Sequence, residues 1–195
     1  MLIIGLTGGI GSGKTTVSNL FARFNQNKDL ISIIDTDVIA RQIVEKGKPA
    51  YTKILEVFGK AILNDDASIN RSVLRKIIFD DPELKKQLED ITHPAIQTEV
   101  ENTISQLTSQ YCIIVIPLLF ETSSNYPLDR VLVIDCDKDS QIKRASQRDH
   151  VSEDDVNLIL KSQVSREYRL NHADEIIDQV EKLHHLYLNM AKTDK

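Results

Sequence analysis

The sequence predicts an α/β protein with a parallel sheet flanked by helices, an inserted helical domain and a helical lid. Three observations lead to this fold class. Short apolar runs of strand length alternate with helical patterns, the first of these runs leads into a glycine-rich turn, and a long central stretch is helical throughout. A chain of 195 residues is long enough for one domain of this kind with an insertion.

The glycine-rich turn follows the first apolar run, Leu2 to Leu6, and precedes an amphipathic helical pattern that starts at Thr16. It contains Gly8-x-x-x-x-Gly13-Lys14-Thr15, the P-loop pattern. Glycines leave room for backbone N–H groups to surround phosphate oxygens at a helix N-terminus. We therefore expect a P-loop NTPase-type sheet with a nucleotide phosphate site formed by Gly8, Gly9, Ile10, Gly11, Ser12, Gly13, Lys14, Thr15 and Thr16.

Two side chains at the end of this turn have predicted roles. Lys14 should reach the β- and γ-phosphates, and the Thr15 hydroxyl should hold a Mg²⁺ ion. The alternative is a glycine-rich turn that binds nothing, which the flanking strand and helix patterns disfavour.

A second strand is predicted at Leu30 to Ile34, and it ends at Asp35-Thr36-Asp37. In open α/β sheets the ligand lies outside the carboxyl ends of the strands, so both carboxylates should emerge at the edge that carries the P-loop. They could coordinate Mg²⁺ or receive a hydroxyl proton. Alternatively, one of them only caps the next helix, predicted from Val38 to Lys46.

The next strand, Tyr111 to Ile116, is an unbroken apolar run and is the expected centre of the sheet. In a generic P-loop NTPase an aspartate ends an apolar strand and contacts the metal. Here the strand runs into Pro117, and the first acid after it is Glu121. Asp37 is therefore the candidate metal carboxylate.

Between these two strands the chain reads as consecutive helices, with breaks near Gly47 to Pro49 and Asp80 to Pro82. A helical insertion at this point is the usual place for the domain that holds a phosphoryl acceptor. Candidate contacts to an anionic acceptor are Arg41, Arg71, Arg75 and His93. For the arginines the alternative is a solvated helix face, and for His93 a structural role.

A further strand, Arg130 to Asp135, precedes a polar segment from Gln141 to His172 that is rich in arginine and nearly as rich in acids. Arg144 and Arg148 lie four residues apart, on one helical face. The composition favours a mobile lid that brings guanidinium groups over phosphates and excludes water. An exposed helical hairpin without a catalytic role is the alternative.

The last predicted elements are a short strand at Ala173 to Asp178 and a helix from about Glu181 to Met190. The predicted organisation is therefore a core of residues 1–38, 111–140 and 173–195, an acceptor domain of residues 39–110 and a lid of residues 141–172. His184 and His185 lie on the final helix without further ligands nearby in sequence, which disfavours a metal role.

The composition of the chain disfavours nucleic acid and membranes as binding partners. A net charge of −5 argues against a nucleic-acid-binding surface, and no apolar run is long enough to cross a membrane. Cys112 and Cys136 lie in apolar runs and read as small buried hydrophobes rather than as a disulfide or metal site. We expect a cytoplasmic protein with a small-molecule substrate and no obligate protein partner.

The motifs taken in order resemble those of the dephospho-coenzyme A kinase family. They are GLTGGIGSGKTT, IIDTDVIAR, ITHPAI, VIPLLFE, DRVLVID, QIKRASQRD and SREYRLNHADEIID, and they extend over nearly the whole chain. The resemblance implies transfer of the ATP γ-phosphate to the ribose 3′-hydroxyl of dephospho-coenzyme A, the last step of coenzyme A synthesis. It also implies that Asp37 lies beside the acceptor hydroxyl, and that Arg144 and Arg148 belong to the lid near the nucleotide.

From this combined pattern the expected catalytic residues are Asp37, Lys14, Arg144 and Arg148. The expected acceptor contacts are Asp37, Arg41, Arg75, His93 and Glu121, and the expected metal ligands are Thr15 and Asp37. The family usually has an Asn-x-Gly turn after the last strand, whereas here Asp178 passes almost directly into Gln179-Val180-Glu181.

Two other functions share parts of this pattern. A kinase of the nucleoside monophosphate or shikimate type would share the P-loop and the lid, but its small acceptor would not need so long a helical insertion. A GTP-dependent switch protein would need an Asn-Lys-x-Asp motif after a strand. The nearest match, Asn171-His172-Ala173-Asp174, lacks the lysine and precedes its strand, so ATP is the expected nucleotide.

Overall fold

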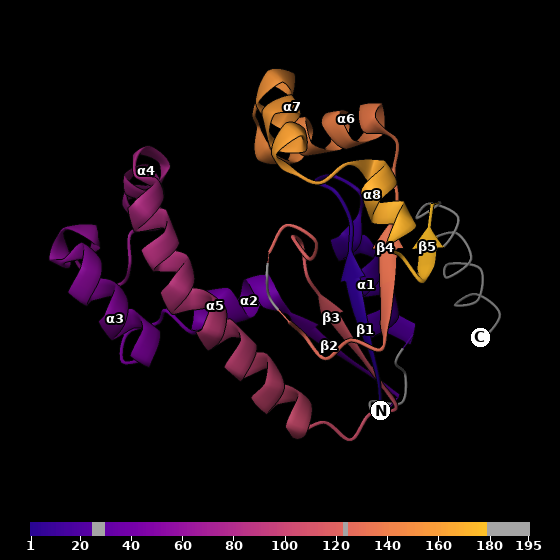
Figure 1. The fold of residues 1–195 in the computed structure, drawn as a ribbon, viewed down its shortest axis with the longest axis horizontal. Coiled ribbons are helices and arrows are strands. Elements are labelled where there is room, and N and C mark those ends of the chain that lie inside the picture. The colour runs from indigo at the N-terminus through magenta and orange to yellow at the C-terminus, as the bar shows by residue number, and fades with distance from the viewer. Residues whose placement is uncertain (25–29, 123–124, 179–195) are drawn as a thin grey trace. The chain divides into compact units, whose positions relative to one another are not determined.

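The structure is a computed structural model that describes residues 1–24, 30–122 and 125–178. The chain divides into two compact units, one of residues 1–35 with 107–195 and the other of residues 36–106. The first unit contains the sheet, and the second is helical (Figure 1).

The sheet has five parallel strands in the order β2-β3-β1-β4-β5. This arrangement, with helices flanking the sheet, confirms the predicted fold class. The strands are β1 (Leu2–Thr7), β2 (Ile31–Asp35), β3 (Tyr111–Val115), β4 (Arg130–Ile134) and β5 (Glu175–Ile177).

The middle strand is β1, not β3 as the sequence predicted. It pairs with β3 on one side, with Leu6 opposite Val115, and with β4 on the other, with Leu6 opposite Leu132. An unbroken apolar run indicates burial on both faces, which every interior strand shares, so it cannot identify the central one. The buried core formed around these strands consists of Leu6, Val17, Ile113, Val115, Leu132 and Ile134.

The helices of the sheet unit are α1 (Lys14–Phe24), α6 (Lys138–Asp149), α7 (Glu153–Ser162) and α8 (Arg166–Asn171). The last three each begin at a side chain that accepts a hydrogen bond from the third residue after it: Asp137, Ser152 and Ser165. At α7 the Asp155 side chain also bonds back to the Ser152 N–H, which completes a capping box. These three helices lie at the carboxyl ends of the strands (Figure 1).

The helical unit contains α2 (Thr36–Gln42), α3 (Pro49–Phe58), the short 3-10 helix η1 (Lys60–Ile62), α4 (Arg71–Asp80) and α5 (Pro82–Ser105). Its core is built on Ile54, Ile62 and Leu74. The expected breaks near residues 47–49 and 80–82 are confirmed, with Pro49 and Pro82 as the first residues of their helices. The first helix begins at Thr36 and ends at Gln42, so the prediction of Val38 to Lys46 was shifted and too long.

Pro94 lies inside α5 without ending it. A proline has no N–H for the carbonyl of the residue four positions earlier, here Asp90. The helix nevertheless continues to Ser105, and it packs against α2, α3 and α4.

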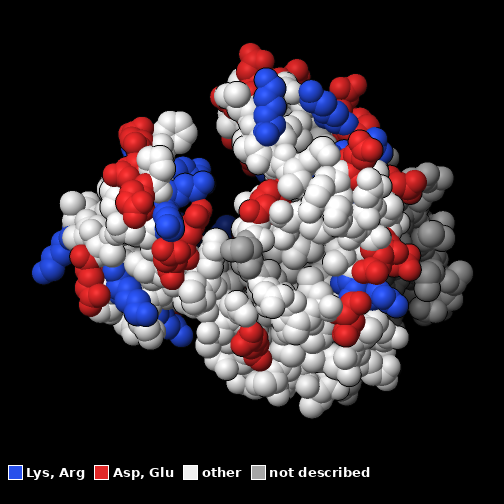
Figure 2. Space-filling view, viewed as in Figure 1, with Lys and Arg blue, Asp and Glu red and all other residues white. Residues whose placement is uncertain are grey.

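Lys, Arg, Asp and Glu side chains are interspersed over α3 and α4 and over α6 and α7 on the face shown in Figure 2. Cys112 is buried on β3 and Cys136 is half-buried after β4, and both are free thiols as expected. Among the described residues, no helix is both long enough and apolar enough to cross a membrane. The predicted final helix and His184-His185 lie outside the described residues.

Candidate active site

The P-loop, residues 8–13, connects β1 to α1. Gly11 has a φ of +71°, and a Cβ there would lie 2.5 Å from the backbone oxygen of Gln141. A Cβ on Gly9 would lie 2.3 Å from the Gln141 amide nitrogen and 3.0 Å from Nη2 of Arg169. The loop therefore requires glycine at Gly11, where the contact is with backbone at the start of α6, whereas a Cβ at Gly9 would have to displace the Gln141 and Arg169 side chains.

Lys14, the first residue of α1, turns back over the loop. Its Nζ donates to the carbonyl oxygens of Gly8 at 2.8 Å and Gly9 at 3.0 Å. Thr15 and Thr16 follow on the first turn of α1 with exposed side chains. The hydroxyl of Ser12 is buried, and no partner for it occurs among the described residues. The loop thus presents an ammonium group, backbone N–H groups and hydroxyls at one helix N-terminus, which suits an anion.

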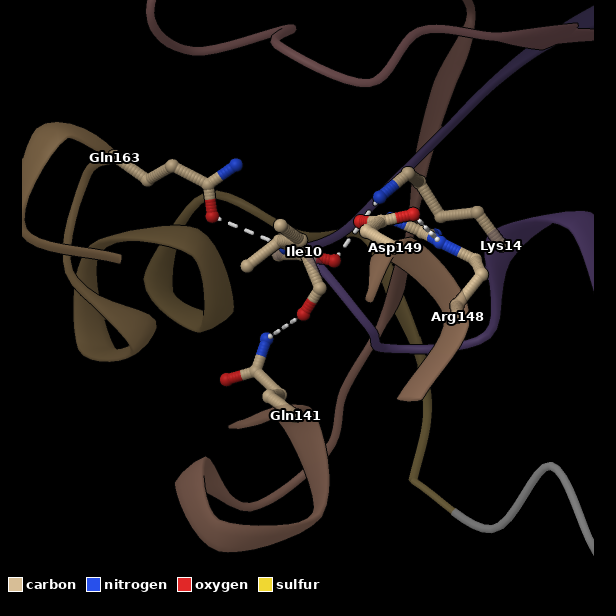
Figure 3. Close-up of polar contacts among 7 residues, drawn as sticks. Ile10, Lys14, Gln141, Arg148, Asp149 and Gln163 are labelled. Carbon is tan, nitrogen blue, oxygen red and sulfur yellow. Dashed lines mark hydrogen bonds and ion pairs between the residues drawn. The ribbon is translucent and has the colours of Figure 1, made fainter. Parts of the chain in front are cut away.

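Both backbone groups of Ile10, at the tip of the loop, are bound by glutamine side chains (Figure 3). Gln141, on the first turn of α6 and only 4% exposed, donates from Nε2 to the Ile10 oxygen at 2.8 Å. Gln163, directly after α7, accepts from the Ile10 N–H at 3.1 Å. The start of the predicted lid segment and the residue that follows α7 therefore meet at one residue of the P-loop.

The connection between α7 and α8 is also tied to the end of β3. Its Val164 N–H donates to Oε1 of Glu121 at 3.0 Å, and its Val164 oxygen accepts from Nη1 of Arg169 at 2.6 Å. Arg169 is only 7% exposed, and this burial lowers its pKa from the ordinary value. Next to Glu121, the ring of Phe120 meets Tyr168 edge-on at 5.8 Å, and Tyr168 stacks on His172 at 4.0 Å.

A third strand end, that of β4, is tied to α8. Asp135 directly follows β4 and is buried, and Nε and Nη2 of Arg166 donate to its two carboxylate oxygens. These hydrogen bonds hold the pKa of Asp135 below its ordinary value, and they raise the pKa of Arg166. Residues 163–169 are thus fixed to segments that follow β1, β3 and β4, which meet at the carboxyl edge of the sheet.

A family model for dephospho-CoA kinase matches residues 2–184 of the chain. The chain belongs to the dephospho-CoA kinase family. It is therefore an enzyme, a kinase of coenzyme A biosynthesis.

Individual dephospho-CoA kinases match over nearly full length. The chain is 42% identical to that of Vibrio parahaemolyticus over 201 residues, covering 98% of this chain and 97% of the relative. It is 44% identical to that of Escherichia coli K12 over 199 residues, covering 97% and 94%. A solved dephospho-CoA kinase from Campylobacter jejuni has a TM-score of 0.67 at 27% identity, covering 99% and 98%. The solved structure of TT1252 from Thermus thermophilus has a TM-score of 0.81 at 26% identity, covering 98% and 97%.

The predicted catalytic arginines of the lid both lie on α6. Nη1 of Arg144 is 3.4 Å from the sulfur of Cys136, and the exposed Arg148 forms a two-point ion pair with Asp149, the next residue (Figure 3). The other two arginines of the segment, Arg166 and Arg169, have the protein contacts described above.

The remaining predicted residues of a dephospho-CoA kinase site lie at or within the helical unit. Asp35 ends β2 in the sheet unit, and Asp37 is the second residue of α2 with an exposed side chain. Arg41 is exposed at the end of α2, Arg71 and Arg75 are exposed on α4, and His93 is half-buried on α5.

The helical unit also contains a cavity of about 710 Å³. It is lined by the end of α2, the start of α3 and the middle of α5, and it carries charges of both signs from Glu45, Lys48, Lys53, Asp90 and Glu99. None of the predicted acceptor contacts lines it.

The residues that the sequence did not assign to the site are Gln141, Gln163 and Asp135. An acid that directly follows an apolar strand, as Asp135 does, is a signal that could have been used. The two glutamines belong to no short motif, and their partner Ile10 is 131 and 153 residues away in sequence.

Proposed function

We propose that the enzyme transfers the γ-phosphate of ATP to the ribose 3′-hydroxyl of dephospho-CoA, giving coenzyme A and ADP, in the cytoplasm. The observation that carries the proposal is the P-loop at the end of β1, with Lys14 bonded across it, in a chain that matches the dephospho-CoA kinase family over residues 2–184.

The nucleotide triphosphate binds along residues 8 to 16. The N-terminus of α1 and the loop N–H groups other than those of Ile10 and Ser12 face its oxygens, and the Lys14 ammonium neutralises charge on the transferring phosphoryl group. Phosphoryl transfer has a loose transition state, so catalysis consists mainly of positioning and electrostatic stabilisation. The Lys14 head group, bonded to two carbonyls, is already oriented before the reaction.

The donor set fits a Mg²⁺ ion. Thr15 offers an exposed hydroxyl on α1, and Asp35 and Asp37 offer carboxylates at and just after the end of β2. Mg²⁺ prefers oxygen ligands and is commonly bound by one or two protein groups together with substrate phosphates and water, so this small set suffices. When bound at Thr15 and Asp37, the ion would neutralise charge on the phosphates.

The acceptor binds through the helical unit and the end of β3. Asp37 orients the 3′-hydroxyl and accepts its proton, while Arg41, Arg75 and His93 offer cationic or polar groups to an acceptor that carries a diphosphate. Glu121 contributes a carboxylate at the acceptor site. Arg144 and Arg148 contact the triphosphate when the lid closes, which requires Arg148 to leave Asp149.

The function is tested by measuring ATP consumption with dephospho-CoA, AMP and shikimate in parallel. We expect turnover with dephospho-CoA and a product phosphorylated at the ribose 3′ position, identified by mass spectrometry and phosphorus NMR. Turnover with AMP or shikimate in its place would contradict the proposal and would favour the other small-molecule kinases.

The role of Asp37 is tested with Asp37→Asn. General-base assistance is worth about 10²- to 10⁴-fold, and the lower end applies to a loose phosphoryl-transfer transition state. We expect kcat to fall by at least about 10²-fold, with little weakening of dephospho-CoA binding. Asp65→Asn, at an exposed aspartate of the same unit, is the control and should leave kcat unchanged.

Added Mg²⁺ separates two contributions of Asp37. Recovery of much of the rate of Asp37→Asn at high Mg²⁺ would favour metal positioning over proton acceptance. A variant that retained more than about a tenth of the wild-type kcat would show a loss smaller than the range expected for a general base. Asp35 or Glu121 would then replace Asp37 as the candidate for this role.

A further inference from the structure

We infer that Gln163 is a positioning residue that orients Lys14 through a single peptide group of the P-loop. The inference rests on the proposed function, because it gives Lys14 a role in phosphoryl transfer. It assigns part of that role to a residue beyond the P-loop motif, on the connection between α7 and α8.

The peptide group in question joins Gly9 to Ile10. Its N–H donates to Oε1 of Gln163 at 3.1 Å, and its carbonyl oxygen, that of Gly9, accepts from Nζ of Lys14 at 3.0 Å. A peptide group is planar, so its N–H and C=O directions cannot change independently. The Gln163 oxygen holds the N–H side of this peptide group, and the Ser12 N–H donates to the same Gly9 oxygen at 3.2 Å; together they set the direction in which the carbonyl meets the lysine ammonium.

This peptide group needs such support because of the residues around it. Gly9 and Gly11 flank Ile10, and glycine allows backbone rotations that other residues resist. The next peptide group is fixed independently, since the Ile10 oxygen accepts from the buried Gln141 at 2.8 Å. Gln163 therefore supplies the matching restraint on the other side of Ile10 (Figure 3).

The Gln163 side chain is itself held by its surroundings. The next residue, Val164, donates its N–H to Glu121 and accepts from Arg169. Arg169 is buried against Gly9, so the connection is held on the P-loop by more than one contact. Gln163 is only half-buried, unlike Gln141, and its side chain reaches Ile10 from the connection between α7 and α8. The orientation of Lys14 thus depends on the position of this connection.

Gln163→Leu removes the acceptor oxygen and keeps a side chain of similar size. One hydrogen bond contributes modestly, so we expect kcat to fall about 3- to 10-fold while the KM for ATP changes less than about 2-fold. This split is expected because an oriented ammonium stabilises the transition state more than the bound substrate. Gln147→Leu, at an exposed glutamine on α6, is the matched control and should leave both constants unchanged.

The decisive measurement is a double-mutant cycle with Lys14. If Gln163 acts through Lys14, then Gln163→Leu should change the rate less than about 2-fold once Lys14 is replaced by alanine, because the residue it orients is gone. Single-turnover assays with radiolabelled ATP and excess enzyme keep the slow variants measurable. The same double-mutant cycle is repeated with Lys14→Arg in place of Lys14→Ala.

Three outcomes would overturn the inference. Equal losses from Gln163→Leu with and without Lys14 would show that Gln163 acts independently of the lysine. A lower KM for ATP at unchanged kcat would show that the Gln163 oxygen competes with the nucleotide for the loop. Unchanged constants would show that the bond is not used. A wild-type enzyme inactive with dephospho-CoA would instead contradict the proposed function, whereas the inference is judged on variant ratios with the acceptor that the wild type uses.

Discussion

The close approach of α6 to the P-loop can be tested at Gly11. Gly11→Ala places a Cβ 2.5 Å from the backbone oxygen of Gln141 and 3.1 Å from its Cα. These are backbone atoms, so a change of side-chain rotamer cannot relieve the contact. Gly59 provides a control for the positive φ alone: its φ is +69° against +71° at Gly11, its ψ is −175°, and a Cβ there would meet nothing within 4 Å.

The two substitutions share one cost and differ in another. A non-glycine residue held at a positive φ costs about 1–3 kcal/mol, which applies to both. Forcing extra volume into a packed position costs about 1–3 kcal/mol more, which applies only to Gly11→Ala. We therefore expect the free energy of unfolding to fall by about 1–3 kcal/mol for Gly59→Ala and by about 2–6 kcal/mol for Gly11→Ala.

Urea unfolding followed by far-UV circular dichroism measures both losses, and the kinase assay measures the functional result. Displacing the start of α6 moves the Gln141 amide away from Ile10, and a misplacement of about 1 Å can cost about 10²-fold in rate. Gly59→Ala should keep near-normal kcat. Equal stability losses for the two variants, together with kcat of Gly11→Ala within threefold of wild type, would refute the close packing of α6 on the loop.

Three further results are expected. Lys14→Ala should remain folded but lose nearly all kinase activity, because the ammonium acts on the phosphates; near-normal turnover would contradict its assignment. Arg166→Gln should lower the free energy of unfolding at pH values above 3.8, the ordinary pKa of an aspartate such as Asp135. This loss should shrink as the pH falls through the lower pKa that Asp135 has in the folded state. A loss that is independent of pH from 2 to 6 in urea unfolding would argue against the ion pair. ATP and dephospho-CoA together should protect residues 141–172 from limited proteolysis; equal cleavage rates with and without ligands would leave the lid proposal unsupported.

The parts of the fold that the sequence predicted were those with a local cause. Neighbouring residues specify the P-loop, the strand runs and the helix starts at Pro49 and Pro82. A local sequence pattern is therefore enough to predict them. The start of α2 was placed two residues too late, because Thr36 and Asp37 carry no apolar periodicity and the helix begins on them directly after β2.

The parts that could not be predicted depend on partners distant in sequence. The central place of β1 follows from pairing with both β3 and β4, and no property of the β1 residues reports this pairing. The ion pair of Arg166 with Asp135 joins residues 31 apart, and the arginine alone reads as one more member of a cationic lid. Gln163 is a neutral residue whose only distinguishing feature is where the chain places it.

The connection between β2 and β3 can accept insertions and deletions without disturbing the sheet. These strands are parallel neighbours, with Asp35 opposite Val115. The chain must therefore cross back from the end of β2 to the start of β3, and a dozen or more residues are enough for such a crossover. The whole helical unit occupies this one connection, and α5 alone, at 24 residues, spans about 36 Å against about 17 Å for a five-residue strand. Residues between α2 and α5 are therefore spare length as far as strand pairing is concerned. Insertions or deletions there would reshape the helical unit while leaving the register of the sheet, and the P-loop built on it, unaltered.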